Sequence, residues 1–270
     1  MTATTICLIN QKGGCGKSSI CFHLAGAFAQ TGLHVLLIDS DPQGSLSQGF
    51  FGSEFVEALP PELTVAALLA PEKAGFGERR VIQRTQFDGI AICPANSHSA
   101  RLNTPAPETT GLAQFALREF VDDLTAFDVI LVDCPPNLYR CTWSAMVACD
   151  WCLVPVPPED FGTQGLRVVH QAIEQARRLN PGLQCLGHVV TRSDSRLLVH
   201  RAYEQRLREL YGQSVLETVI PEFSAFKVAL ACRQPVSIHA PRSAAAVLTK
   251  QLSREILDHI AMSNKRTHVA

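Results

Sequence analysis

Gln11-Lys12-Gly13-Gly14-Cys15-Gly16-Lys17-Ser18-Ser19 lies between a short apolar run, Thr5–Asn10, and a helical pattern at Lys17–Gln30. A strand, a glycine-rich turn and a helix N-terminus in this order are the context of a phosphate-binding loop. Glycines let backbone N–H groups converge on phosphate oxygens without side-chain clashes. We therefore expect nucleotide phosphates to be bound by Gly13, Gly14, Cys15, Gly16, Lys17, Ser18 and Ser19.

Two side chains of this loop have specific expected tasks. Lys17 should reach the β- and γ-phosphates, and the hydroxyl of Ser18 should coordinate Mg²⁺. The generic pattern GxxxxGK[ST] is not met, because Gln11 stands where its first glycine belongs. An additional lysine, Lys12, instead precedes the glycine pair, which makes this loop more specific than the generic one.

Strand-like and helix-like patterns alternate along the chain. Near-continuous apolar runs predict strands buried on both faces, and helical periodicity between them predicts crossover helices. We expect an α/β fold, a P-loop NTPase whose mostly parallel, twisted central sheet is flanked by helices on both faces. The sequence predicts one domain over residues 1–270. The expected strands after the first are His34–Ile38, Gly89–Cys93, Asp128–Val132, Cys152–Val156, Leu186–Thr191 and Val215–Ile220, with helices at about 110–126, 165–179, 197–211 and 243–261.

Carboxylates follow two of these expected strands. Asp41 lies in Asp39-Ser40-Asp41-Pro42-Gln43-Gly44, and Asp133 ends the strand before Cys134-Pro135-Pro136. An aspartate at the carboxyl end of a buried parallel strand lies at the ligand edge of the sheet. Asp41 could orient an attacking water by one hydrogen bond, although an aspartate before proline also suits a helix cap or a turn.

These segments together resemble the ParA family of partition ATPases, within the wider group that includes MinD. The resemblance covers nearly the whole chain and implies an ATP-sandwich homodimer. In it Lys12 would reach the phosphates bound by the other subunit, Asp41 would activate the attacking water, and Asp133 would hold Mg²⁺ through water. It also places adenine against the loops after the last two strands, which here contain Arg192, Pro221, Glu222 and Phe223.

Composition supports a folded protein and restricts its class. Of 270 residues, 46% are hydrophobic and 18% charged, which excludes a disordered chain. No apolar run approaches the ~20 residues of a membrane span, and the first ten residues lack a basic secretory leader. Ten cysteines in such a chain indicate reduced thiols and a cytoplasmic location. Cys149 and Cys152 form a CxxC pair without a second pair to complete a zinc site, so we expect them to pack in the core.

The charge is distributed unevenly. Residues 1–160 carry 9 Lys and Arg against 17 Asp and Glu, a charge of −8, whereas residues 161–270 carry 15 against 8, a charge of +7. By resemblance, the ATP-bound dimer would bind double-stranded DNA nonspecifically and associate with the nucleoid. The candidate contacts are Arg196, Arg201, Lys227, Arg233 and Lys250.

Other partners follow from the same resemblance. A ParB-like protein or a cargo adaptor would stimulate hydrolysis, whereas a membrane partner is not expected because Met262–Ala270 offers no apolar face. No N-terminal helix-turn-helix extension is expected. Many ParA proteins read IPR-x-x-R where this chain reads Ile220-Pro221-Glu222-Phe223-Ser224-Ala225, so both arginines are missing. The alternative is therefore an ATP-switched regulator of protein assembly that does not use DNA.

Overall fold

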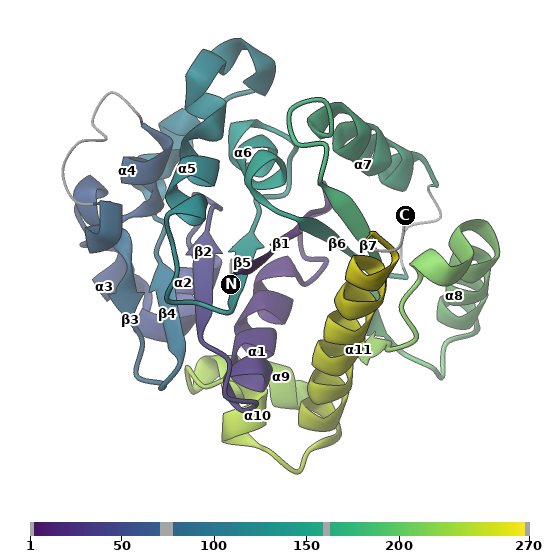
Figure 1. Ribbon diagram of the computed structural model, residues 1–270. Coiled ribbons are helices and arrows are strands. Elements are labelled where there is room, and N and C mark those ends of the chain that lie inside the picture. The colour runs from purple at the N-terminus through teal and green to yellow at the C-terminus, as the bar shows by residue number, and fades with distance from the viewer. Residues whose placement is uncertain (1–2, 71–77, 159–162, 268–270) are drawn as a thin grey trace.

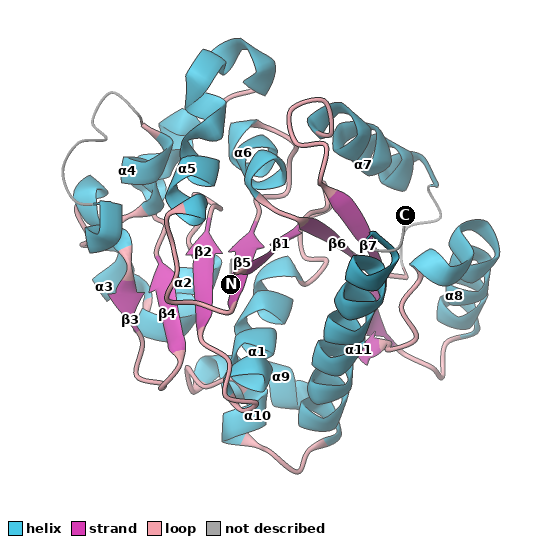
Figure 2. Ribbon diagram, viewed as in Figure 1, coloured by secondary structure: helices cyan, strands magenta, loops and turns pink. Residues whose placement is uncertain are grey.

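The computed structural model describes residues 3–70, 78–158 and 163–267, and its centre is one eight-stranded sheet (Figures 1 and 2). The strand order is β3-β4-β2-β5-β1-β6-β7-β8, and every neighbouring pair is parallel except β3 with β4. This confirms the expected fold class. The strands are β1 (Thr4–Leu8), β2 (Val35–Asp39), β3 (Gln83–Arg84), β4 (Ile90–Cys93), β5 (Val129–Asp133), β6 (Trp151–Val156), β7 (Gln184–Ser193) and β8 (Ile220–Pro221).

Helices cover both faces of the sheet (Figure 1). One face packs against α4 to α8, and the other against α1, α2 and α11. The short 3-10 helices of the described residues include Pro61–Leu63, Glu78–Val81, Ser97–Leu102, Pro107–Phe115 and Gly212–Ser214. The α-helices are α1 (Lys17–Ala29), α2 (Ser45–Phe51), α3 (Ser53–Glu57), α4 (Val65–Leu69), α5 (Ala116–Asp122), α6 (Arg140–Ala148), α7 (Thr163–Ala176), α8 (Leu198–Tyr211), α9 (Ser224–Ala231), α10 (Val236–His239) and α11 (Ala244–Thr267).

The alternation of side chains along the strands explains this layering. In β2, Leu36 and Ile38 join the cluster under α4 to α8, whereas Val35 and Leu37 join the cluster under α1 and α11. Because both faces are covered, the strands need apolar residues at successive positions rather than at alternate ones. The same need produces the near-continuous apolar runs of the sequence.

The structure departs from the sequence-based expectations at the sheet edge. The strand expected over Val215–Ile220 is instead an isolated bridge between Val215 and His188, followed by the two-residue β8.

The helix expected over 110–126 begins as a 3-10 helix and becomes α-helical only at Ala116. Helix α6 was missed because all nine of its residues are buried, which leaves no polar face to produce a helical period.

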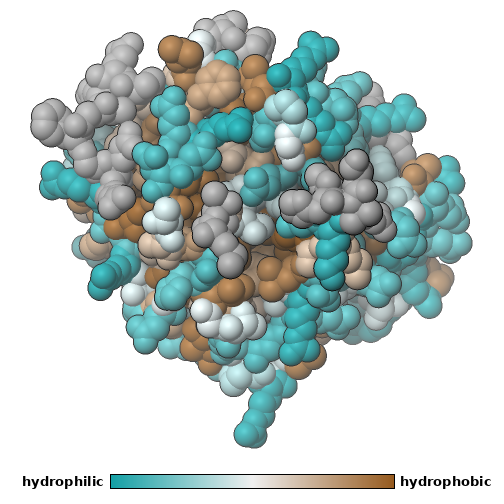
Figure 3. Space-filling view, viewed as in Figure 1, coloured by the Kyte–Doolittle hydropathy of each residue, from teal (hydrophilic) through white to brown (hydrophobic). Residues whose placement is uncertain are grey.

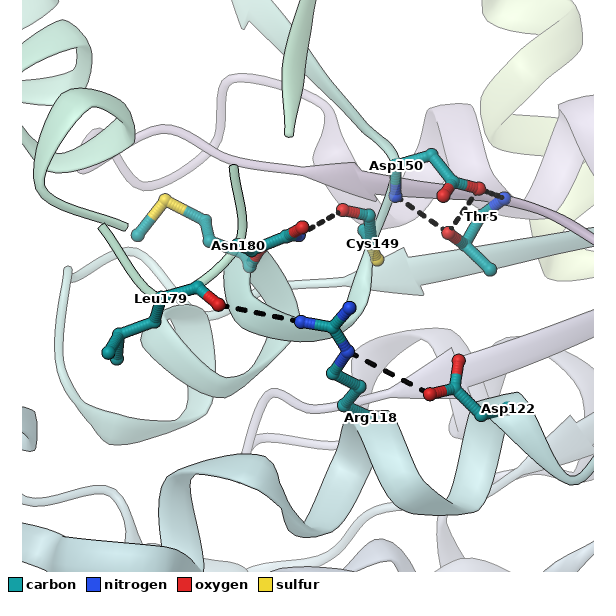
Figure 4. A network of polar contacts seen from close by, with 8 residues as sticks. Thr5, Arg118, Asp122, Cys149, Asp150, Leu179 and Asn180 are labelled. Atoms are coloured by element: carbon teal, nitrogen blue, oxygen red, sulfur yellow. Dashed lines mark hydrogen bonds and ion pairs between the residues drawn. The ribbon is translucent and has the colours of Figure 1, made fainter. Parts of the chain in front are cut away.

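Polar contacts join the elements at the amino ends of the central strands (Figure 4). Asp150 accepts hydrogen bonds from the backbone N–H of Thr5 at 3.0 Å and from its hydroxyl at 2.8 Å. The amide of Asn180 donates to the carbonyl of Cys149 at 2.7 Å, and Arg118 on α5 reaches the carbonyl of Leu179. These bonds satisfy buried backbone groups at the junction of α5, α6 and the chain entering β7.

The CxxC pair belongs to the core, as expected. Cys149 and Cys152 are buried free thiols, and the Sγ of Cys152 lies 3.3 Å from that of Cys7 on the neighbouring strand. Among the described residues no group of three or more His, Cys, Asp or Glu side chains is arranged to hold a metal ion. Cys7, Cys149 and Cys152 are buried members of the core cluster, where they fill space between the sheet and the helices.

Helix α1 crosses α10 at a glycine. A Cβ on Gly26 would overlap the ring of Pro235 and lie 2.8 Å from the Oγ of Ser237. Glycine inside a helix costs stability relative to alanine, so its presence there indicates this close approach.

We predict that Gly26→Ala lowers the free energy of unfolding by about 1–3 kcal/mol, because the added methyl forces the two helices apart. Chemical denaturation of both proteins measures the difference. Gly182→Ala is the matched control, since its Cβ would meet only Asn180 at 3.6 Å. Equal losses in the two variants would contradict the packing explanation.

Two histidines are buried in neutral form. Burial lowers the pKa of His188 to about 4 and that of His23 to about 3. The Nε2 of His188 lies 3.0 Å from the Nε2 of His170, and the Nδ1 of His23 accepts from the backbone N–H of Val236 at 3.0 Å. Their depressed pKa values mean that the unfolded chain binds more protons than the folded one below pH 6.5.

We predict that the stability advantage of the wild type over His188→Gln shrinks by up to roughly 3 kcal/mol as the pH falls from 6.5 towards 4. In the variant the unfolded chain no longer gains this proton. Denaturation at several pH values measures both proteins, and the comparison cancels the other titrating groups. His98→Gln, at an exposed site, is the control for loss of an imidazole ring. A constant difference for His188→Gln would refute the pKa assignment.

Candidate functional site

The phosphate loop connects β1 to α1 and has the backbone that its glycines allow. Gly14 and Gly16 have φ values of 70° and 97°, in the left-handed region that other residues rarely adopt. Helix α1 begins directly after Gly16, so its free N–H groups and the positive end of its dipole face the loop. This arrangement is an anion site built from backbone.

Lys17 is buried at the start of α1, with only 6% of its surface exposed. Its Nζ donates to the carbonyls of Asn10 at 3.1 Å and Lys12 at 3.3 Å. Asn10 is itself fixed, because its amide donates to the carbonyl of Pro155 at 2.7 Å. The ammonium group is thus held inside the loop.

Asp133 ends β5 beside the loop and is fully buried. Neither carboxylate oxygen accepts a hydrogen bond, although Ser18 is close enough to lower the pKa of this group. Burial outweighs Ser18 and Lys17 and raises the pKa of Asp133 to about 7. A buried carboxylate with unsatisfied oxygens next to a hydroxyl fits a hydrated Mg²⁺, which takes oxygen ligands.

Two further aspartates follow β2 and differ in their surroundings. Asp39 is paired in register with Asp133 and accepts hydrogen bonds from the backbone and hydroxyl of Ser47, at 2.9 and 2.6 Å. Asp41 lines the cleft beside the phosphate loop. One of its oxygens also accepts from the backbone N–H of Gln43 at 3.0 Å. Asp41 therefore makes the predicted turn and still faces the cleft.

A cleft of about 490 Å³ joins the phosphate loop to the residues predicted to hold adenine. That volume is in the range of small-molecule sites. Arg192, Pro221, Glu222 and Phe223 all line it. Three residues of α9 that the sequence reasoning did not assign to nucleotide, Phe226, Lys227 and Leu230, line it too. Phe223, Phe226 and Leu230 recur at helical spacing, which predicts an apolar helix face but not its contact with the cleft.

Lys12 is half-buried at the entrance of the loop and is not part of the cleft lining. Its backbone N–H donates to the Oδ1 of Asn10 at 3.0 Å. The action predicted for Lys12, on phosphates bound by a second copy of the chain, stays a prediction.

The predicted DNA contacts are spread over several elements. Arg196 precedes α8 and pairs with Asp194 at 2.7 Å, and Arg201 is exposed on α8. Lys227 is on α9, where it pairs with Glu222, and Arg233 follows α9 and contacts the carbonyl of Phe51. Half-buried Lys250 belongs to α11.

On the face shown in Figure 3, hydrophilic residues predominate over α8, on the right of the view. Of the predicted contacts, Arg201 belongs to α8 and Arg196 lies two residues before its start. Within the described ranges no helix combines the length and apolar character needed to cross a bilayer.

Comparison with known proteins identifies the family. Residues 3–185 match the model of the family described as "AAA domain". The chain is 33% identical over 256 residues to the chromosome-partitioning ATPase Soj of Thermus thermophilus, covering 94% of this chain and 96% of that protein.

Two solved structures have the same fold over nearly the whole chain. Cobyrinic acid a,c-diamide synthase from Mycobacterium smegmatis, with bound ADP and magnesium, gives a TM-score of 0.80 at 24% identity and covers 96% of both chains. The cell division ATPase MinD of Pyrococcus furiosus gives 0.74 at 25% identity, covering 95% of this chain and 99% of that one. The protein therefore belongs to the ParA/Soj family of P-loop ATPases.

Proposed function

We propose that this protein is a partition-type ATPase that binds Mg-ATP in the cleft, dimerises around it and hydrolyses it to ADP and phosphate. The observation that carries the proposal is the meeting, in one cleft, of a buried lysine, a glycine loop and Asp41, with buried Asp133 close to Ser18 and Lys17. One continuous sheet supports a single ATPase domain over residues 1–270.

Each group of side chains in the cleft has its own proposed task in binding or hydrolysis. The loop N–H groups, Lys17 and Ser19 bind the phosphates, and Pro221 and Phe223 contact the base, with Arg192 and Glu222 beside them in the cleft lining. Ser18 and Asp133 hold Mg²⁺, which when bound offsets charge on the transferring phosphoryl group. Asp41 orients the water that attacks the γ-phosphorus as the bond to the leaving ADP oxygen breaks. Lys12 donates to the phosphates of the partner copy and so links hydrolysis to the dimer.

We predict that Asp41→Asn keeps ATP binding and dimerisation but lowers kcat at least about 100-fold, because the amide cannot accept the proton of the attacking water. The amide oxygen can still accept from Gln43, so the turn is retained. Phosphate release and nucleotide titration measure the two properties separately.

Asp122→Asn on α5 is the matched control and should turn over at the wild-type rate. Unchanged kcat in Asp41→Asn would remove Asp41 from the catalytic role. Loss of ATP binding in that variant would instead indicate a role in the ground state.

The ATP-bound dimer is further proposed to bind duplex DNA without sequence preference, to associate with the nucleoid in the cytoplasm and to position a chromosome, plasmid or protein cargo. A ParB-like protein or an adaptor would stimulate hydrolysis. The charge of +7 on residues 161–270 supports this role. The alternative, an assembly regulator that does not use DNA, is favoured by Glu222, which stands where many relatives carry arginine and which engages Lys227 at 2.7 Å.

We predict that Mg-ATP, but not ADP, induces binding to a random-sequence duplex, and that the affinity falls steeply with salt because phosphate contacts release counterions. Fluorescence anisotropy at low and moderate salt measures it. Arg201→Ala should weaken binding without changing nucleotide affinity, with Arg101→Ala, at an exposed site outside residues 161–270, as the control. A protein that is dimeric with ATP yet does not bind duplex at low salt would favour the assembly regulator.

A further inference from the structure

The carboxyl end of β7 is hydrogen-bonded to the phosphate loop. The hydroxyl of Thr191 donates to the carbonyl of Cys15 at 2.8 Å. The guanidinium of Arg192, the next residue, donates through Nη1 to the carbonyl of Gly14 at 3.0 Å. Two successive residues of one strand therefore hold two successive carbonyls of the loop.

Holding a carbonyl also orients an N–H. In a planar trans peptide the C=O of one residue and the N–H of the next point in opposite directions. Fixing the carbonyls of Gly14 and Cys15 towards β7 thus turns the N–H groups of Cys15 and Gly16 away from β7. These N–H groups belong to the set that an anion in the loop would use.

The backbone of Arg192 is strained in a way that serves this contact. Its φ of 54° is left-handed, which is uncommon for arginine, and the β7–β8 register shifts between Thr191 and Ser193. Such conformations cost free energy and persist where the surrounding structure requires them. Here the bulge leaves the side chains of Thr191 and Arg192 both directed at the loop, although alternation in a regular strand would send them to opposite faces.

Arg192 is in turn held by the β8–α9 segment. Its Nη2 lies 3.6 Å from the Oε1 of Glu222, and the same oxygen lies 2.7 Å from the Nζ of Lys227. Lys227, and then Arg192, lower the pKa of Glu222, so this carboxylate is ionised near neutral pH. A chain of contacts therefore runs from α9 through Glu222 and Arg192 to Gly14.

We propose that Thr191 and Arg192 are positioning residues that preorganise the phosphate loop, and that Glu222 anchors Arg192 for this task. The proposal rests on the proposed binding of nucleotide in this cleft. It gives Arg192 a role on the phosphate side and not in contact with the base. It also gives Glu222 a reason to be acidic, because a glutamate there orients the arginine that holds Gly14.

The test compares ATP with inorganic tripolyphosphate, both with Mg²⁺, by calorimetric titration. Tripolyphosphate lacks a base, so a variant that disturbs only base contacts leaves its affinity unchanged. We expect Thr191→Val and Arg192→Asn each to weaken both ligands by a similar factor, about fivefold or more, which corresponds to one lost hydrogen bond. Asparagine tolerates the left-handed backbone but is too short to reach Gly14. Arg192→Lys, which keeps a long donor, should recover part of the affinity.

Glu222→Ala separates positioning from simple charge. If Arg192 acted only through its positive charge, removing the carboxylate beside it would strengthen tripolyphosphate binding. The anchoring role predicts weaker binding instead. Arg178→Ala, at an exposed site after α7, is the control for loss of a surface charge.

The outcomes are distinct. Parallel losses for both ligands, with melting temperatures near that of the wild type, support the positioning role. Weakened ATP with unchanged tripolyphosphate in Arg192→Asn overturns it in favour of a base contact, and tighter tripolyphosphate in Glu222→Ala overturns the anchor. If the wild type binds neither ligand, the proposed nucleotide site itself is refuted, and not only the positioning role of Thr191 and Arg192.

Discussion

The buried ammonium of Lys17 is the constraint around which the rest of the site is arranged. A charge with 6% exposure needs compensation, which here comes from loop carbonyls and from Asp133 at the same sheet edge. The strand order places this carboxylate there. Strand β1 lies next to β5, whose last residue Asp133 is in register with Leu8, and β2 on the other side of β5 brings Asp39 level with Asp133. Parallel pairing therefore brings together acidic side chains that are distant in sequence.

The sequence predicted most of this edge because the physical requirements there are local. A strand buried on both faces must be apolar at successive positions, and a phosphate loop must contain glycine, so both leave clear patterns. The cleft wall formed by Phe226, Lys227 and Leu230 was missed because it depends on how α9 folds back over the loop, which is a tertiary property. Helix α6 was missed because complete burial erases the helical period. The strand expected over Val215–Ile220 was wrong, because the apolar run there pairs only through a single bridge at Val215 and the two-residue β8.

The structure also changes how the sequence departure at Glu222 is understood. From sequence alone, glutamate in place of arginine removes a cation from a surface expected to meet DNA. In the structure the same residue lies in the nucleotide cleft between Arg192 and Lys227. Glu222 therefore affects nucleotide binding most directly. Its effect on DNA binding would be indirect, because it pairs with cations that could otherwise contact DNA.

Ion pairs within the protein weaken the support that the net charge gives to DNA binding. The excess of +7 counts formal charges, yet several arginines of residues 161–270 already have carboxylate partners. Arg196 pairs with Asp194, Arg206 with Glu209 and Arg208 with Glu204. Exposed pairs contribute little stability, so a polyanion could compete for these guanidinium groups, but each exchange leaves a carboxylate facing phosphate. Cations without such a partner should therefore contribute most to any DNA affinity. Exposed Arg201 belongs to this class, since no ion pair to it is found among the described residues.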